Sequence, residues 1–219
     1  MSISDLNPDV VRAYIQIKTD PYGVAHRVSE LIRIYNGYPY KKEMYMSVRN
    51  EFNSGERSAS NLIFLNQCGF NGLVRYNRRG DLNTPWGHKE IISFSIVGKI
   101  INAGNLLARK MVDIFPAHEF SWVETCVEPG DLVYFDPPYL SSNGFTQYWK
   151  NDFSLQAHIN LRDLALRLKE RGIMVRIANA DNPQVRELYS DFCLYELTAA
   201  RPINRDKDGR GSVPELLIM

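Results

Sequence analysis

The chain has 219 residues, enough to bury the core of one large domain or of one domain with a sizeable insertion. Its 26 basic and 25 acidic residues give a formal net charge of +1, which excludes a globally basic protein, so a surface that binds nucleic acid would be a local patch. The scattered cysteines and histidines lack metal-ligand spacing and no segment resembles a signal peptide or a membrane span, so the sequence predicts a cytoplasmic protein with reduced thiols and no zinc.

The first third of the chain is predicted to form a helical unit. Asn7-Pro8 supplies an N-cap and a first helical position for a helix that ends near Thr19. Between residues 24 and 67, apolar residues recur at helical spacing in three stripes, divided by short connections that contain Gly, Pro and Ser. The stripes comprise Val24, Val28, Leu31, Ile32 and Tyr35, then Met44, Val48 and Phe52, then Leu62 and Leu65.

Residues 69–89 have a different character, because glycines and asparagines punctuate aromatic residues and arginines. Gly80-Asp81 lies between two short runs and predicts a hairpin-like ribbon or an ordered loop. A helix around residues 98–109 is expected to follow.

From Met111 onward the pattern alternates between strands and helices. A helical stripe precedes Gly172, and Asp181-Asn182-Pro183 opens a short helix. Such alternation is typical of a doubly wound α/β sheet, which makes the helical unit an insertion between an early strand-helix element and the rest of the sheet. The strand candidates are Met111–Phe115, Leu132–Phe135, Ile173–Ala178, Phe192–Leu197 and Glu215–Met219.

The tetrapeptide Asp136-Pro137-Pro138-Tyr139 directly follows the predicted strand Leu132–Phe135. In an open α/β sheet, ligands bind where the carboxyl ends of strands meet their loops, so Asp136 should point into a crevice. An acid and a proline carbonyl there can accept both protons of an exocyclic amine while Tyr139 stacks on the attached ring. This chemistry suits methylation of an amino group on a flipped nucleobase. The alternative is an ordinary strand-to-turn junction.

Asp5 comes after what could be the end of a strand and just before the capped helix. In nucleotide-binding α/β folds, an acid at the end of the second strand accepts hydrogen bonds from ribose hydroxyls. The alternative is an acid favoured near a helix N-terminus by the helix dipole. The presence of Asp136 in the same chain favours the functional interpretation.

Two basic segments are candidate DNA contacts. Residues 66–80 interleave three arginines with aromatics and amides, and arginine reads guanine edges or phosphates while asparagine reads adenine edges. A solvated basic turn explains that pattern equally well. Residues 201–211 form a second basic stretch that could cover a substrate or touch the DNA backbone, with a solvated hairpin tip as the alternative.

Together these motifs resemble the Dam-type, D12-class family of DNA adenine-N6 methyltransferases, over most of the chain from Ile3 to Met219. The most specific part is residues 66–87. Within it, residues 70–87, FNGLVRYNRRGDLNTPWG, are similar to the family's Y/F-N-G-L-x-R-x-N-x-x-G-x-x-N-x-P-x-G run. The tetrapeptide resembles the family's catalytic motif, and Phe145–Tyr148 resembles the segment downstream of it. Residues 201–217 are similar to the family's late basic loop and closing strand.

The resemblance implies a Rossmann-like class I methyltransferase sheet with an inserted, mostly helical DNA-recognition domain. The catalytic domain would comprise residues 1–19 and 96–219, and the recognition domain residues 20–95. Such an enzyme transfers a methyl group from S-adenosyl-L-methionine to adenine N6 in double-stranded DNA after base flipping, and needs no metal. The run at 70–87 resembles members that modify GATC.

The resemblance also implies roles for single residues. Asp5 would bind the ribose of the methyl donor, Asp136 and the Pro137 carbonyl would accept hydrogen bonds from adenine N6, and Tyr139 would stack on the extruded base. Pro138 completes the catalytic motif, and Asp136 would also lie against the methyl donor. The implied DNA-binding residues are Phe70, Asn71, Leu73, Arg75, Asn77, Arg78, Pro85, Arg201 and Arg205.

The sequence departs from the family pattern at its start. The family's usual first strand and Phe-x-Gly-x-Gly-like loop, which holds the methionine half of the methyl donor, have no counterpart here. A truncated gene product, a separate N-terminal polypeptide and a shortened chain are the alternatives that follow. Two other functions also stay open, a catalytically impaired DNA-binding remnant and an amino-group methyltransferase that acts on RNA or protein. Restriction-modification, phage self-protection and orphan regulation would leave the same motifs.

Overall fold

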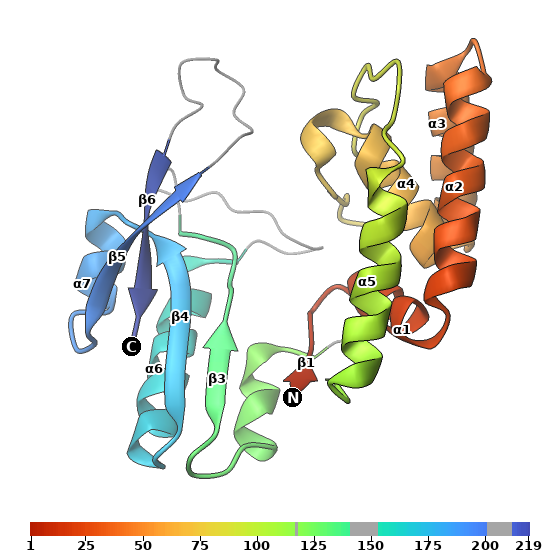
Figure 1. Cartoon of the computed structure of the whole chain (residues 1–219). Helices are drawn as coiled ribbons and strands as arrows, with labels where there is room; N and C mark the ends of the chain where they lie inside the picture. The colour runs from red at the N-terminus through yellow and green to blue at the C-terminus, as the bar shows by residue number, and fades with distance from the viewer. Residues whose placement is uncertain (117, 141–152, 201–211) are drawn as a thin grey trace. The chain divides into compact units, whose positions relative to one another are not determined.

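The computed structural model describes residues 1–116, 118–140, 153–200 and 212–219. The chain divides into two compact units, Met1–Glu119 and Phe120–Met219 (Figure 1). Among the described helices, none is long and apolar enough to cross a membrane.

The first unit is mainly helical and carries one short pair of strands. Its strands are β1 (Ser2–Ile3) and β2 (Asp113–Ile114), and its helices are α1 (Pro8–Thr19), α2 (Pro21–Gly37), α3 (Lys41–Asn53), α4 (Ala59–Cys68), the 3-10 helix η1 (Phe70–Gly72) and α5 (Ser95–Arg109). β1 and β2 pair in parallel, which brings the start and the end of the unit side by side. Both α1 and α2 pack against α4 and α5.

Side-chain caps set where these helices begin. Asn7, Asp20 and Ser58 each accept a hydrogen bond from a backbone N–H in the first turn of α1, α2 and α4. Pro8 and Pro21 occupy the first helical positions, where a missing N–H costs nothing. All members of the three predicted apolar stripes are buried except the half-buried Met44, which confirms these helices.

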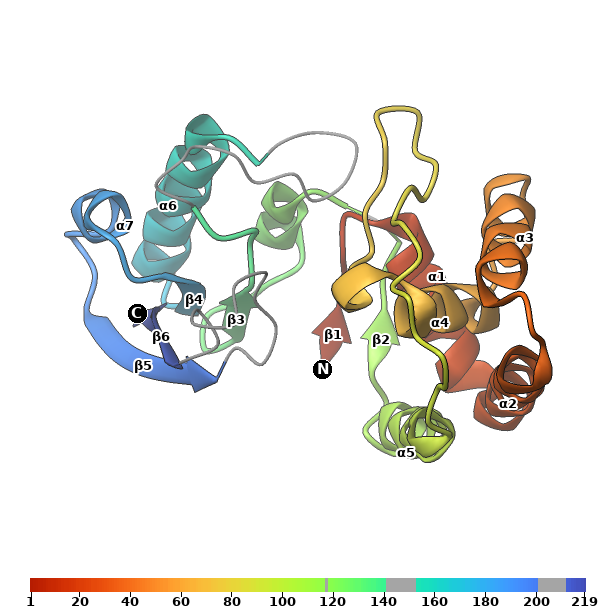
Figure 2. The same cartoon turned by 90° about the horizontal axis from the view of Figure 1, so that it is seen from above.

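Residues 69–87 form a narrow ribbon, which Figure 2 shows extending from η1. Two isolated antiparallel bridges hold it together, Gly69 with Trp86 and Tyr76 with Leu82. A Cβ atom at Gly87 would lie 2.6 Å from the carbonyl oxygen of Gly69, so only glycine permits the two arms to come this close. The predicted hairpin-like ribbon is confirmed, with two single bridges in place of regular strands.

The second unit is a mixed α/β layer. Its strands are β3 (Leu132–Phe135), β4 (Met174–Ala180), β5 (Leu194–Ala200) and β6 (Ser212–Ile218), and its helices are the 3-10 helix η2 (Phe120–Thr125), α6 (Leu155–Glu170) and α7 (Pro183–Leu188). The strand order is β3-β4-β6-β5. β3 and β4 are parallel and joined through α6, whereas β6 runs antiparallel to both of its neighbours.

The strands predicted from sequence agree with the observed bounds to within three residues at each end, and Met111–Phe115 is shortened to β2. Met111 adopts a φ of 48°, which an extended strand cannot contain, so the strand begins after it.

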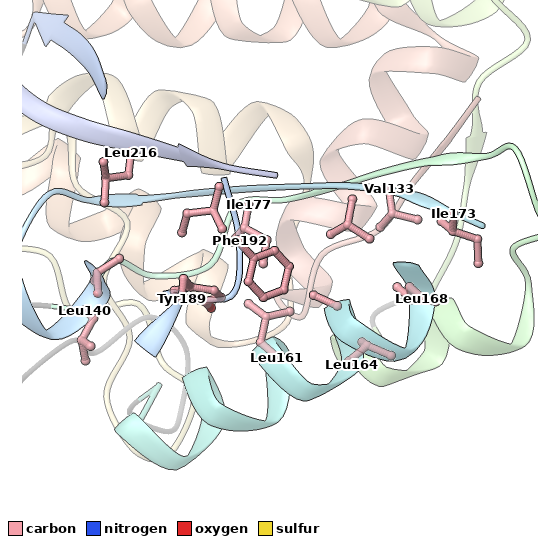
Figure 3. Close-up of a cluster of buried hydrophobic side chains, with 14 residues drawn as sticks. Val133, Leu140, Leu161, Leu164, Leu168, Ile173, Ile177, Tyr189, Phe192 and Leu216 are labelled. Atoms are coloured by element: carbon pink, nitrogen blue, oxygen red, sulfur yellow. The ribbon is translucent and has the colours of Figure 1, made fainter. Parts of the chain in front are cut away.

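Helices α6 and α7 bury their apolar faces against the sheet of the second unit (Figure 3). The cluster comprises Val133, Leu140, Leu161, Leu164, Ala165, Leu168, Ile173, Val175, Ile177, Val185, Tyr189, Phe192, Leu216 and Ile218. Leu164, Ala165 and Leu168 are at most 1% exposed, as the predicted stripe requires. The core fixes β3 and β4 side by side, and the tetrapeptide begins at the carboxyl end of β3.

Candidate active site and DNA interface

The tetrapeptide combines an exposed acid with a firmly packed backbone. Asp136 is exposed, whereas Pro137 is buried and Pro138 and Tyr139 are half-buried. The last residue of β3, Phe135, pairs with Ile177 of β4, so Asp136 is the first residue to leave the sheet. This position is the one expected for a ligand-binding acid in an open α/β sheet.

Tyr139 is held by an acid from a strand two places away from β3 in the sheet. Its hydroxyl donates a hydrogen bond of 3.1 Å to Oε2 of Glu215, which lies on β6. Burial, reinforced by the negative charge of Glu215, raises the pKa of Tyr139 to about 12. The phenol therefore stays neutral at physiological pH, which suits a ring that stacks on a base.

His158 lies on α6 next to the tetrapeptide and is fully buried. Burial lowers the pKa of His158 to about 4, although the nearby carbonyl of Pro138 favours the protonated form. Within the described part of the chain, neither ring nitrogen has a hydrogen-bond partner. The ring of Phe153 meets the imidazole edge-on at 4.6 Å. A neutral imidazole therefore packs against the tetrapeptide.

Asp5 follows β1, as the sequence predicted. Its Oδ1 accepts a 2.7 Å hydrogen bond from the N–H of Asn7, the N-cap of α1, so the carboxylate is oriented by the start of that helix. A carboxylate at the end of a strand is the kind of acceptor to which ribose hydroxyls donate hydrogen bonds. Asp5 belongs to the first unit and Asp136 to the second.

A buried ion network connects the start of α1 to the ribbon. The side chain of Asp9 is 1% exposed and contacts Arg12 and Arg57, each through an N···O distance of 2.8 Å. Arg57 also donates a 2.9 Å hydrogen bond to the carbonyl of Gly80 at the ribbon tip. Because a buried carboxylate needs such partners, this network fixes the ribbon against the helix that follows Asp5.

The ribbon presents several of the predicted DNA-binding side chains. Arg75 and Arg78 are exposed, and the large apolar side chains of Phe70 and Leu73 are 40% and 51% exposed. Pro85 is exposed as well. An exposed surface that mixes arginines and large apolar groups is suited to reading base edges and wedging into a base stack.

Two amides shape the ribbon from within. Asn77 accepts backbone hydrogen bonds from Arg79 and Asp81 and donates to the Asp81 carboxylate, so its amide builds the turn. Asn83 holds Arg75, whose Nε donates to Oδ1 of Asn83 at 2.9 Å. The guanidinium of Arg75 is therefore oriented before any ligand arrives.

Asn71 adopts a φ of 53°, in the left-handed region that asparagine tolerates better than most residues. Beside it, the Nδ2 of Asn66 donates to the carbonyl of Gly72, which closes the loop at the start of the ribbon. Asn71 is half-buried there.

The remaining predicted site residues, Arg201 and Arg205, and the segment Phe145–Tyr148 lie outside the described residues. Within the described ranges, no group of three His, Cys, Asp or Glu side chains is arranged to hold a metal ion.

Sequence reasoning missed Asp9, Arg57, His158 and Glu215. No local pattern marks them, since their partners lie far along the chain. Asp9 and Arg57 are 48 residues apart, and Tyr139 and Glu215 are 76 residues apart.

An exposed acid in an Asp-Pro-Pro-Tyr segment after a parallel strand, together with an arginine-bearing ribbon, fits an amino-group methyltransferase that acts on DNA. The profile of the D12 class N6 adenine-specific DNA methyltransferases matches residues 1–203. The chain belongs to this family.

Several relatives cover nearly the whole chain. A DNA adenine methylase of Vibrio cholerae is 32% identical in an alignment of 225 positions that covers 99% of this chain and 78% of that protein. A type II methyltransferase of Methanocaldococcus jannaschii is also 32% identical, in an alignment of 233 positions with the same coverage. The DNA adenine methylase of Escherichia coli K12 is 30% identical in an alignment of 231 positions, which again covers 99% of this chain and 78% of that protein.

Proposed function

We propose that this member of the family methylates adenine N6 in duplex DNA at the Asp136–Tyr139 tetrapeptide, with S-adenosyl-L-methionine as the methyl donor. The observation that carries the proposal is the position of Asp136, exposed at the carboxyl end of β3 while the residues after it are packed. The methyl transfer to DNA follows from the family; the donor and the residues are our assignment.

The chemistry needs no strong base. The Asp136 carboxylate and the Pro137 carbonyl would each accept a hydrogen bond from adenine N6, which directs the nitrogen lone pair out of the ring plane. When bound, S-adenosyl-L-methionine supplies a methyl group already activated by a sulfonium. Catalysis then depends mainly on holding the reacting atoms in line. Asp136 would receive the proton that N6 releases after the new bond has formed.

The tyrosine contributes the other half of base recognition. Tyr139, neutral and anchored to Glu215, offers a flat ring for stacking on the extruded adenine. Asp5 would accept hydrogen bonds from the ribose hydroxyls of the donor, a role supported by its carboxylate at the end of β1.

We assign DNA recognition to residues 20–95 and catalysis to residues 1–19 and 96–219. Phe70 and Asn71 would lie where the base leaves the duplex, Arg75 and Pro85 near the recognition bases, and Leu73 and Arg78 beside them. Asn77 would act indirectly, since its amide builds the turn of the ribbon. Arg201 and Arg205, which lie outside the described residues, would contact the DNA backbone through their positive charges.

The test is transfer of labelled methyl groups to duplexes that contain or lack GATC, and to a matched RNA. We expect label in DNA only, more in the GATC duplex, and none with Asp136→Ala. Asp191→Asn, which changes an exposed acid of the same unit, should behave as wild type. Label in RNA would contradict the substrate class, and undiminished label with Asp136→Ala would contradict the assigned site. Retained duplex binding without any transfer would indicate a DNA-binding remnant.

A further inference from the structure

We infer that Asn179 and Asn182 act as positioning residues that hold the tetrapeptide in its methyl-transfer geometry. The inference deepens the proposed function and rests on it. Neither side chain belongs to the tetrapeptide or to the ribbon, and both come from the segment around the end of β4.

The tetrapeptide needs an anchor because it has left the sheet. β3 ends at Phe135, where the ladder with β4 also ends. Two of the next three residues are prolines, which have no N–H to donate to a neighbouring strand. The backbone that presents Asp136 and the Pro137 carbonyl therefore cannot be held by an ordinary β ladder.

The anchor is found one residue after the tetrapeptide, at Leu140. The N–H of Leu140 donates a 3.0 Å hydrogen bond to Oδ1 of Asn179, and Nδ2 of Asn182 donates a 2.8 Å hydrogen bond to the carbonyl of Leu140. The two asparagines thus supply the two hydrogen bonds that a neighbouring strand would make with this residue.

Both asparagines are themselves fixed by the fold. Asn179 is fully buried in β4, where its backbone is paired in register with Leu216 of β6, and its Oδ1 also accepts the N–H of Ala180 at 2.9 Å. Asn182 is the N-cap of α7, and its Oδ1 accepts the N–H of Val185 at 2.9 Å. Movement of either amide would disrupt these hydrogen bonds.

The four residues Asp136–Tyr139 are consequently tied at both ends. The β3–β4 ladder holds the entry at Phe135, and the asparagine pair holds the exit at Leu140, whose side chain is 4% exposed in the core. A segment this short has little freedom once both ends are fixed. Catalytic geometry must be kept to within about 0.5 Å, so loss of the exit anchor should slow the chemical step more than DNA binding.

One detail favours this role for Asn179. Its Nδ2 is buried and has no hydrogen-bond partner within the described ranges. Buried polar atoms normally have a partner, so this unpaired donor is a cost that the Asn179 side chain carries at this position. Its carbonyl oxygen, by contrast, accepts two backbone hydrogen bonds. The role of Asn179 therefore lies in its carbonyl oxygen, which accepts hydrogen bonds from the N–H groups of Leu140 and Ala180.

Asn182 allows the anchor to be tested without unfolding the protein. Asn182→Ser keeps an oxygen that can cap α7 but removes the donor to Leu140, whereas Asn182→Ala removes both. Ser154→Ala is the matched control, because Ser154 caps α6 in the same unit through the N–H of Ala157 and, within the described residues, its side chain makes no hydrogen bond to the tetrapeptide.

The experiment measures kcat, duplex Kd, Tm and amide hydrogen exchange of the peptide that spans residues 136–140. For Asn182→Ser we expect kcat to fall about tenfold or more, with Kd and Tm close to wild type and faster exchange in that peptide. Asn182→Ala should lose Tm as well, while Ser154→Ala should lose Tm but keep kcat. A wild-type kcat, or wild-type exchange at residues 136–140, in Asn182→Ser would overturn the inference.

Asp136→Ala, run in parallel, separates the inference from the function on which it rests. An inactive Asp136→Ala beside a fully active Asn182→Ser would refute the anchor and leave the proposed site intact. An active Asp136→Ala would refute the proposed site and the anchor together. If activity in Asn182→Ser falls only in proportion to Tm, as a general loss of packing would cause, the positioning role is wrong.

Discussion

At the scale of single residues, burial decides the protonation of the groups around the tetrapeptide. Tyr139 stays neutral because its pKa rises to about 12, and His158 stays neutral because its pKa falls to about 4. Neither group gains or loses a proton between about pH 6 and 9, so neither should shape the pH profile of methyl transfer in that range.

His158 should nevertheless make the stability of the fold depend on pH. Its folded pKa of about 4 lies below the ordinary value of 6.5, so between these values the unfolded chain binds more protons than the folded one. Stability is therefore complete above about pH 6.5 and is lost as pH falls toward 4. At pH 5 the loss from this group should be about 2 kcal/mol.

Urea unfolding at pH 7.5 and pH 5.0 measures this effect. Between the two pH values, we expect the free energy of unfolding to fall by about 2 kcal/mol more in the wild type than in His158→Leu. The control His26→Leu, which replaces an exposed histidine, should behave as wild type. Identical pH dependence in wild type and His158→Leu would show that the imidazole is not buried in its neutral form.

Arg75 is the residue for which the structure supports sequence readout most directly, since Asn83 orients its guanidinium. If it makes a bidentate base contact, Arg75→Ala should lose about 1–3 kcal/mol of discrimination between cognate and scrambled duplexes. Competition binding with the two duplexes gives this number. Arg79→Ala, which removes an exposed charge from the same ribbon, is the control. Equal weakening on both duplexes would assign Arg75 to phosphate contact.

At the scale of secondary structure elements, the ribbon owes its shape to the helices behind it. The side chain of Asn53, on α3, makes two hydrogen bonds to the backbone of Leu82. It accepts from the N–H at 2.8 Å and donates to the carbonyl at 3.0 Å. Tyr45 and Arg49 of the same helix donate to the carbonyl of Thr84. One side of α3 therefore serves as a support for the far arm of the ribbon.

Asn53→Ala should weaken DNA binding without any direct contact to DNA. Asn36→Ala is a close control, because Asn36 makes the same pair of hydrogen bonds to Ile92, outside the ribbon. Both variants should lose roughly 1–3 kcal/mol of stability, since each removes two backbone partners. Only Asn53→Ala should raise the duplex Kd. Equal Kd values for the two variants, measured well below both Tm values, would show that the ribbon needs no support from α3.

At the scale of the whole molecule, the sequence predicts elements whose signal is local. Periodic apolar stripes and capping residues predicted α2, α6 and the start of α7. The apolar run before Asp136 predicted β3. The two-residue strands β1 and β2 were indicated by short apolar runs, but no local signal shows that Ser2 pairs with Asp113 across the first unit. Contacts between distant residues are fixed by packing, which one sequence alone does not reveal.

The same division holds for the candidate site. Asp136 and the ribbon residues could be proposed from sequence, since their motifs are contiguous and chemically distinctive. The supporting residues Asn179, Asn182 and Glu215 could not, because asparagine and glutamate are common and their partners lie 39 to 76 residues away. The sequence motif thus predicts where the reacting residues lie, whereas the residues that support the tetrapeptide are visible only in the folded structure.

We propose that Asp136 directs methyl transfer to adenine N6 in duplex DNA. The most direct test of this role is mass spectrometry of the nucleosides released from a duplex after incubation with S-adenosyl-L-methionine and either wild type or Asp136→Ala. We expect N6-methyladenine with the wild type and none with a folded, DNA-binding Asp136→Ala. A methyl group on cytosine, or N6-methyladenine at the wild-type level from Asp136→Ala, would contradict it.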